Sequence, residues 1–253
     1  KILKYLFKSL SPLTKNLIIV IDGCTDNTSK KINQTIKEIN FKKEIEIEII
    51  YTDDIWETKA NNKGLRLVKT EFATIVQDDM LIKHKHWDEG LINVYRNYRV
   101  FAVSGRSAHD FNFEKGNLII KNVFGREAPL GDKNIFAKLI SKFLIYTGSF
   151  WIYEMISPIG FRMSVNRGPL LFKVKHLKEL NYFDEEFAPF ELDDIDLCCR
   201  AFKKFGLLSA CKPINFKMLG RSKSISSLSQ KVSFNSIKKN TKILISRHSD
   251  LIA

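Results

Sequence analysis

The 253-residue chain has no CxxC pair and no long apolar run. Its four cysteines stand alone or directly adjacent, which speaks against a zinc site or a disulfide framework and fits a reducing compartment best. The longest apolar region, 135–161, is broken by Lys138, Lys142 and Glu154, whereas spanning a bilayer takes about eighteen apolar residues in a row. No signal-peptide pattern is seen either. These absences favour a protein of the cytoplasm.

Negative charge is also scarce in this sequence. Lysine and arginine number 41 against 28 aspartate and glutamate residues, which gives a formal net charge of +13 at pH 7. Such a surplus attracts phosphate in any form, whether nucleic acid, anionic lipid headgroups or a nucleotide diphosphate, and charge alone does not choose among them. With 44% hydrophobic and 27% charged residues, the composition is that of a globular protein and excludes a disordered chain.

Over the first 105 residues, segments with the spacing of apolar residues typical of strands alternate with segments with the spacing typical of helices. Short apolar or strictly alternating runs predict strands, and isoleucine or leucine at helical spacing predicts helices between them. The predicted strands are 17–21, 44–51, 72–76 and 100–104, and the predicted helices are 29–40, 57–69 and 87–98. Strands separated by helices of this length predict an α/β fold, with a mainly parallel sheet flanked by helices and right-handed crossovers.

The pattern weakens after Gly105. Residues 106–134 are polar and mixed, and they predict loops. Helices are predicted at 175–180 and 193–205, the second of which ends where Gly206 is expected as a helix C-terminal glycine.

Acidic residues follow the predicted strands at their carboxyl ends, where sheets of this kind bind ligands. Asp22 follows the first strand, and Asp78 and Asp79 follow the third. Paired carboxylates suit Mg²⁺ or Mn²⁺, which would bridge to a diphosphate, although aspartate is also common in solvated turns. An acid such as Asp22 can contact the base or ribose of a nucleotide, or simply belong to the connecting turn.

A second acidic cluster, Asp193, Asp194 and Asp196, opens the predicted helix at 193–205. One aspartate there would cap free N–H groups and complement the helix dipole, which stabilises by about 1 kcal/mol. Three acids in four residues repel one another, however, and such a cluster needs a cation or a proton to relieve it. Two acidic clusters in so basic a protein therefore indicate a shared site for a metal and a base.

Four segments together resemble the family two glycosyltransferases, which have the GT-A fold. VIDGCTDNT (20–28) resembles the DGSTDxT stretch of that family, and KANNKGL (59–65) resembles its AxNxG segment. IVQDDM (75–80) stands where the DxD motif belongs, and FELDDIDLCCRAFKKFG (190–206) resembles the EDxDLCxR…G motif. The four segments occur in the order of the family, which is much more specific than any one of them.

The resemblance implies a Rossmann-like GT-A core over residues 1–206. The nucleotide-binding half would cover about 1–105, and the acceptor half about 106–206. Residues 207–253 would then form a basic C-terminal extension of helical or irregular structure. One domain is expected, and the sequence contains no internal repeat.

The resemblance also implies a reaction, the inverting transfer of a sugar from a nucleotide-diphosphate donor to an acceptor hydroxyl, with Mn²⁺ or Mg²⁺ on the diphosphate. Asp194 would be the base that takes the acceptor proton, with Asp193 beside it. Asp79, together with Asp78, would serve the metal and the ribose. Asp22 would contact the nucleobase.

Three further residues are expected at the donor by the same resemblance. Lys59 and Asn62 belong to the AxNxG-like segment, and Lys59 would contact the diphosphate. Arg167 lies in VNRGPLLF (165–172), and its guanidinium suits bidentate binding of phosphate. An arginine of a surface loop is an equally good interpretation of Arg167.

The chain departs from the family pattern in three places. It begins with KILKYLFKSL, which looks like the helix after the family's opening strand, so either that strand lies outside this sequence or the nucleotide site is incomplete. Gln77 replaces the first acid of DxD, which places metal binding more heavily on Asp79. Lys217 stands near the position of a histidine in many relatives, and His248 cannot be given that role from sequence.

We expect a nucleotide-diphospho-sugar donor and a glycan or lipid-linked acceptor as partners, and no nucleic acid. The aromatic residues and lysines of 135–161 suit a membrane surface, but we favour core or a lid over the sugar. The basic tail from Lys212 strengthens the interpretation of peripheral contact with the inner face of the cell membrane. Bacterial surface polysaccharide or glycoconjugate synthesis is the expected setting.

Two other functions stay open. A degenerate relative would bind a nucleotide sugar without transferring it, as Gln77 and the missing opening strand allow. A nucleic-acid-binding α/β protein would match the net charge of +13, but the sequence has no aromatic-interleaved basic motif, and its acidic clusters would repel phosphate without a metal. Metal-dependent binding and turnover of a UDP-sugar separate the three.

Overall fold

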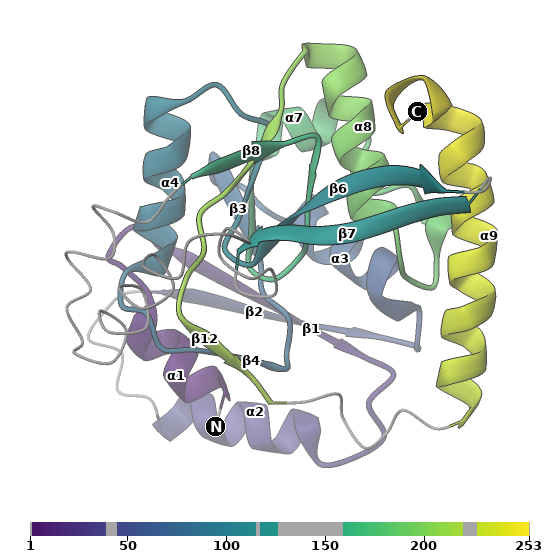
Figure 1. The fold of residues 1–253 in the computed structure, drawn as a ribbon. Coiled ribbons are helices and arrows are strands. Elements are labelled where there is room, and N and C mark those ends of the chain that lie inside the picture. Colours follow the sequence, from purple (N-terminus) through teal and green to yellow (C-terminus); the bar gives the residue numbers. More distant parts are fainter. Residues whose placement is uncertain (1, 39–44, 115–116, 126–158, 220–226, 253) are drawn as a thin grey trace.

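Strands and helices alternate through the first half of the chain (Figure 1). The computed structural model describes residues 2–38, 45–114, 117–125, 159–219 and 227–252. Each strand and helix predicted for this half is present. The elements are α1 (Ile2–Ser9), β1 (Asn16–Asp22), α2 (Thr28–Glu38), β2 (Glu46–Thr52), α3 (Trp56–Arg66), β3 (Phe72–Ile75), β4 (Met80–Ile82), α4 (Trp87–Asn97) and β5 (Ala102–Ser104).

The second half contains more strands than the sequence indicates. Its elements are β6 (Ser107–Glu114), β7 (Asn117–Gly125), β8 (Gly160–Arg162), β9 (Ser164–Val165), β10 (Leu170–Lys173), α7 (Val174–Glu179), the 3₁₀ helix η1 (Glu185–Phe187), α8 (Asp193–Phe205), β11 (Ser209–Cys211), β12 (Phe216–Met218) and α9 (Ser227–Ile252). The two helices predicted here correspond to α7 and α8. The prediction of loops at 106–134 was wrong for the residues of β6 and β7, which pair as an antiparallel ribbon. Such a ribbon needs no continuous apolar run, so the sequence carries no strand signal there. Most of 135–161 lies outside the described residues.

The sheets are mixed rather than mainly parallel, which corrects that part of the predicted fold. The five-stranded sheet has the order β3-β10-β5-β11-β8, and within it only β5 and β11 pair in parallel. The strand β10 lies antiparallel between β3 and β5. A buried apolar run such as Leu170–Lys173 carries no signal for direction, so only the chain path after β5 decides how it pairs.

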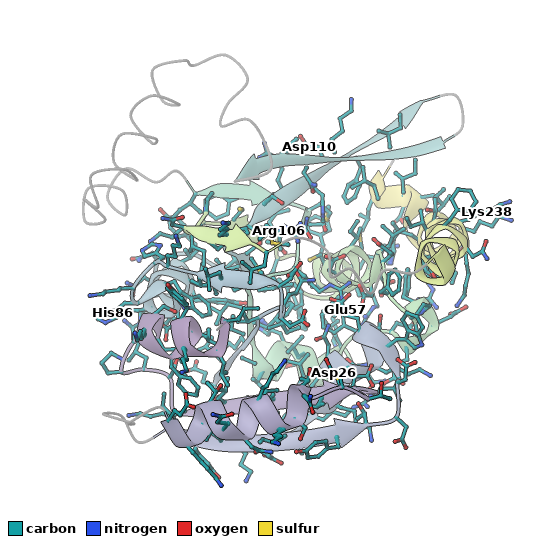
Figure 2. The ribbon with its side chains drawn as sticks, turned by 90° about the horizontal axis from the view of Figure 1, so that it is seen from below. Asp26, Glu57, His86, Arg106, Asp110 and Lys238 are labelled. Atoms are coloured by element: carbon teal, nitrogen blue, oxygen red, sulfur yellow. The ribbon has the colours of Figure 1, made fainter. Side chains whose placement is uncertain are left out.

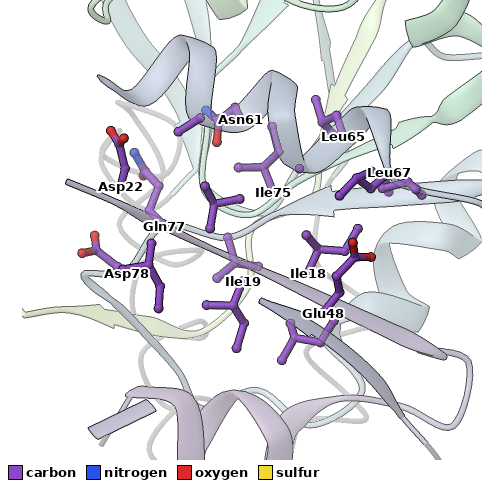
Figure 3. A pocket seen from close by; sticks show the side chains of 18 of the residues that line it. Ile18, Ile19, Asp22, Glu48, Asn61, Leu65, Leu67, Ile75, Gln77 and Asp78 are labelled. Carbon is purple, nitrogen blue, oxygen red and sulfur yellow. The ribbon is translucent and has the colours of Figure 1, made fainter. Parts of the chain in front are cut away.

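The strands β1 and β2 form a separate two-stranded parallel sheet. Within the described part of the chain, β1 pairs only with β2, and β3 pairs only with β10. A cavity of about 690 Å³ lies between β1 and β3 and is lined by residues of both (Figure 3).

Alternate side chains of β10 build the core on both faces of the five-stranded sheet. Phe172 packs with Leu177 of α7 and Leu197 of α8 on one face. Leu171 packs with Leu91 of α4 and Leu6 of α1 on the other face. Because successive strand residues point to opposite faces, three buried residues in a row place helices on both sides of the sheet.

A buried carboxylate joins α4 to the segment between α1 and β1. Asp88 accepts hydrogen bonds from the Ser11 backbone N–H at 2.9 Å and from the Ser11 hydroxyl at 2.8 Å. The Thr14 hydroxyl donates a further bond at 2.5 Å. The contacts fix the entry into β1 and hence the position of Asp22 at its far end.

Replacing Asp88 by alanine should lower the free energy of unfolding by about 3 kcal/mol, because buried donors would lose a charged acceptor. Urea unfolding followed by circular dichroism measures this. The control is Asp110→Ala, which removes an exposed carboxylate paired with Arg162 and should cost about 1 kcal/mol or less. Equal losses in the two variants would contradict a structural role for Asp88.

Candidate active site

The carboxyl ends of β1 and β3 lie at one end of the cavity, where Asp22, Gln77 and Asp78 stand together (Figure 3). Glu57 of α3 also lines this cavity. It accepts a hydrogen bond from the Gln77 amide at 3.1 Å. Three strand-end and helix-start segments that are far apart in sequence therefore meet at one place.

A buried arginine connects this group to the second acidic cluster. The two terminal nitrogens of Arg167 contact the two carboxylate oxygens of Asp193, at 2.7 and 3.2 Å. Glu57 approaches the same guanidinium at 3.3 Å, and Asp194 approaches its Nε at 3.9 Å. Burial lowers the pKa of Arg167, but the surrounding carboxylates outweigh burial and raise it. We expected a diphosphate contact or a surface-loop arginine, whereas the structure buries Arg167 among carboxylates.

Asp193 and Asp194 differ in how fully their oxygens are engaged. Asp193 is 0% exposed and accepts a further bond from the Thr58 hydroxyl at 2.8 Å. Burial raises the pKa of Asp193, Arg167 lowers it, and Asp194 raises it again. Asp194 is 6% exposed, and its Oδ1 accepts the N–H of Ile195 at 2.9 Å. Asp193 is thus bound into an ion pair, and Asp194 is the less engaged of the two.

Asp22 has its oxygens directed at the start of α3. Oδ1 accepts from the Thr52 hydroxyl and from the Ile55 N–H, each at 2.7 Å. Oδ2 accepts from the Trp56 N–H at 2.8 Å. An acid that takes up N–H groups at a helix start is favourable whether or not a ligand binds. This carboxylate therefore orients α3. These hydrogen bonds account for an acid at this position even when no nucleotide is bound.

Asp79 is the described residue best suited to a metal. Its Oδ1 is buried and has no hydrogen-bond partner, while its neighbour Asp78 is exposed. Burial, and then the charge of Asp78, raise the pKa of Asp79, while Arg106 lowers it. A carboxylate oxygen left without a donor fits a Mg²⁺ or Mn²⁺ ion, which takes oxygen ligands. The described residues contain no group of three His, Cys, Asp or Glu side chains that could hold a metal ion.

The two expected donor contacts on α3 are placed differently. Lys59 is exposed. Asn62 is fully buried, donates to the Phe183 carbonyl at 2.9 Å and accepts from the Phe183 N–H at 3.1 Å. Asn62 therefore joins α3 to the segment before η1, and its expected role at the donor stays a prediction.

Arg106 is a site residue that the sequence interpretation missed. It follows β5, and its guanidinium contacts the Gln77 side-chain oxygen at 3.4 Å and the Arg167 carbonyl at 3.5 Å. Figure 2 shows Arg106 and Glu57 in the central part of the molecule. The rule that selected the acids after the other strands would have selected Arg106 as well, had it been applied to the strand at 100–104.

Gly168 allows the segment before β10 to approach the site closely. Its φ is +81°, and a Cβ there would lie 2.5 Å from the Gln77 side-chain oxygen and from the Met80 sulfur. Only glycine fits a left-handed backbone at so short a separation. The same approach brings Arg167 against the carboxylates.

Comparison with known proteins adds the family. The sequence profile described as Glycosyl transferase family 2 matches residues 1–156, more than half of the chain. The chain belongs to glycosyl transferase family 2. No curated protein matches it in sequence.

Two solved structures show the same fold as this family 2 chain. S. aureus TarS 1-349 in complex with UDP-GlcNAc has a TM-score of 0.54 at 16% identity, and the match covers 96% of this chain and 62% of that chain. GalNAc-T7 with UDP, GalNAc and Mn²⁺ has a TM-score of 0.59 at 10% identity, covering 89% of this chain and 48% of that one. The GT-A fold expected from the sequence is confirmed. The chain spans about half to two thirds of the length of these structures.

Replacing Arg167 by glutamine should lower the free energy of unfolding by about 3–5 kcal/mol, because Asp193 would be left buried without its cation. Chemical unfolding without any ligand measures this. The matched control is Arg162→Gln, which breaks an exposed pair with Asp110 and should cost about 1 kcal/mol or less. If Arg167 served only to bind phosphate, its loss would cost no more than that of Arg162.

Proposed function

We propose that this family 2 chain carries the catalytic core of an enzyme that transfers a sugar from a nucleoside-diphosphate donor to an acceptor hydroxyl with inversion. The observation that carries the proposal is that Asp79, with its unpartnered buried oxygen, lines one end of a cavity together with Glu57, which connects to Arg167 and the Asp193 carboxylate behind it. A packed core has no need of an unpartnered carboxylate oxygen, which costs free energy unless a cation or donor meets it.

Asp194 is the proposed base. It would accept the proton of the acceptor hydroxyl while the oxygen attacks the anomeric carbon on the face opposite the leaving diphosphate. Asp193 would keep Arg167 in place and thereby set the field around Asp194. Asp79, with Asp78 beside it, would hold a divalent cation, which stabilises charge on the diphosphate when bound.

We place the nucleotide donor at the end of the cavity where β1 and β3 have their carboxyl ends. Arg106 lies close to Asp79 and Gln77 and is the proposed cation for the diphosphate, since a guanidinium binds phosphate in a bidentate manner. Lys59 is exposed on α3 and stays a proposed second contact. Since TarS and GalNAc-T7 are described with UDP-GlcNAc and with UDP and Mn²⁺, we propose a UDP-sugar and Mn²⁺ as the first pair to try. Bacterial surface polysaccharide or glycoconjugate synthesis stays the proposed setting.

A degenerate relative that binds the donor without transfer is the second candidate. It is favoured by Gln77, which replaces an acid and donates its amide to Glu57. An amide at this position contributes no negative charge to a metal site. Turnover, rather than binding, therefore decides between the two.

Nucleotide release from a panel of UDP-, GDP- and dTDP-sugars with Mn²⁺ tests the proposal, with and without candidate acceptors. Asp194→Asn should lower kcat by at least about 100-fold, because the base is lost, and leave UDP affinity nearly unchanged. Asp79→Ala should abolish the dependence of UDP binding on Mn²⁺. The control Asp53→Ala, an exposed acid after β2, should behave as the wild type.

The outcomes separate the candidates. Turnover by the wild type that is lost in both site variants supports the transferase. Metal-dependent UDP binding without turnover on any donor or acceptor supports the degenerate binder. An absence of nucleotide binding, in a protein that still unfolds cooperatively, contradicts both.

We also propose that the protein binds the surface of a membrane and meets its acceptor there. No helix in the described part of the chain is apolar over a length that would cross a bilayer. On α9, Phe234 is 69% exposed and Ile237 is 42% exposed. Lys238 and Lys242 are exposed on the same helix, and Figure 2 shows Lys238 pointing outward. Exposed apolar side chains beside lysines suit an anionic lipid surface.

Co-sedimentation with vesicles of anionic and neutral phospholipid tests this contact. Lys238→Glu with Lys242→Glu should reduce binding to anionic vesicles several-fold, at about 1 kcal/mol per lysine, and added salt should do the same. The matched control is Lys83→Glu with Lys85→Glu, which changes two exposed lysines beside His86. Figure 2 shows His86 far from Lys238. Equal losses in both pairs would mean that net charge, rather than α9, determines the binding.

A further inference from the structure

The C-terminal helix α9 reaches the segment that leads into the proposed base. Asn240 of α9 is 0% exposed, and its amide nitrogen lies 2.8 Å from the Phe187 carbonyl, 3.0 Å from that of Phe190 and 2.9 Å from that of Glu191. Two amide hydrogens are thus shared among three backbone carbonyls. One side chain thereby holds the whole turn between η1 and α8.

The turn held by Asn240 has a backbone that needs support. Glu191 has φ +80° and Leu192 has φ +65°, conformations that residues with a Cβ rarely adopt. Leu192 is the residue before α8, and the structure shows no side-chain cap there. Asp193 and Asp194 follow at once, so the position of their side chains depends on how this turn is held.

A second contact from α9 fixes the first turn of α8. His248 is buried, and its Nε2 lies 2.9 Å from Oδ1 of the buried Asp196. A carboxylate only accepts, so this nitrogen carries the hydrogen. Arg200 donates to the other oxygen at 2.7 Å, and Arg247 lies 3.5 Å from Oδ1.

Apolar packing joins the two contacts. Leu244 of α9 lies between Asn240 and His248 in sequence, is fully buried, and packs with Phe187, Ile195 and Cys199. The buried positions 240 and 244 lie one turn apart on one face of α9, and the buried His248 follows at a kink in this helix. This part of α9 packs against α8 (Figure 1).

We propose that Asn240 and His248 are positioning residues that hold Asp194 in its working geometry, so that α9 belongs to the active site. The proposal rests on the proposed function of Asp194. It adds α9 to a site whose residues Arg167, Asp193 and Asp194 already lie beyond residues 1–156, the part that the family profile matches. Neither side chain lines the cavity between β1 and β3, so we expect them to act on the rate of the chemical step rather than on donor binding.

The test compares Asn240→Asp with Asn235→Asp in the full chain. The first change puts an oxygen in place of the amide nitrogen that faces three carbonyls, while the second makes the same charge change at an exposed position of α9. We expect Asn240→Asp to lower kcat at least about tenfold, as misplaced catalytic groups do, with KM for the donor and Kd for UDP within about twofold. Asn235→Asp should match the wild type.

His248 offers a rescue. In His248→Gln the amide nitrogen of glutamine can take the place of Nε2, so kcat should stay within about threefold of the wild type. In His248→Leu that donor is lost, and kcat should fall as in Asn240→Asp. Equal activity of the glutamine and leucine variants would overturn the role of the hydrogen bond.

Hydrogen exchange of the 187–196 amides gives a readout independent of activity. Faster exchange there in Asn240→Asp and Asn240→Ala, but not in Asn235→Asp, is expected, with unchanged exchange in β10. Wild-type turnover combined with an unchanged kcat in Asn240→Asp overturns the proposal and leaves the proposed function standing. If the wild type neither binds nor turns over a donor, the proposed function fails, and unchanged exchange at 187–196 overturns the positioning role separately.

Discussion

The buried guanidinium of Arg167 is the interaction on which the rest of the site depends. It draws together Glu57 at the start of α3 and Asp193 at the start of α8, two carboxylates that would otherwise repel each other in a buried place. Removing such a cation leaves an uncompensated charge, which costs far more than an exposed ion pair contributes. With Asp194 counted, three carboxylates face one cation, so the centre stays negative.

The negative charge of this centre contrasts with the net charge of +13 of the whole chain. In the proposed function, the excess of lysine and arginine would attract an anionic donor from a distance. Close to the site, Asp79 and its neighbours would repel a diphosphate unless a divalent cation lay between them. The charge of the whole chain and the charge of the site would then act differently on the donor, and the proposed metal would reconcile them.

Two boundaries of the site are made by segments at opposite ends of the fold. On one side, β1 and β3 line the cavity, and in the described part of the chain no strand pairs with both of them. On the other side α9 covers the turn before α8, where Asn240 donates its amide hydrogens to backbone carbonyls of the turn. Both boundaries depend on contacts between residues far apart in sequence, so neither is visible in a local pattern.

The sequence by itself determined the alternation of elements up to β5 apart from the short strand β4, the helix α8 and the acids at the ends of β1 and β3, because hydrophobic period and turn chemistry are local. It did not determine that β10 runs antiparallel between β3 and β5, since a buried run carries no direction. Tertiary structure alone decided that Asn62 is buried, that Arg167 faces Asp193 rather than solvent, that Arg106 contacts Gln77, and that Asn240 contacts the turn before α8. Each of these depends on which distant side chain lies opposite, and only the folded chain supplies that partner.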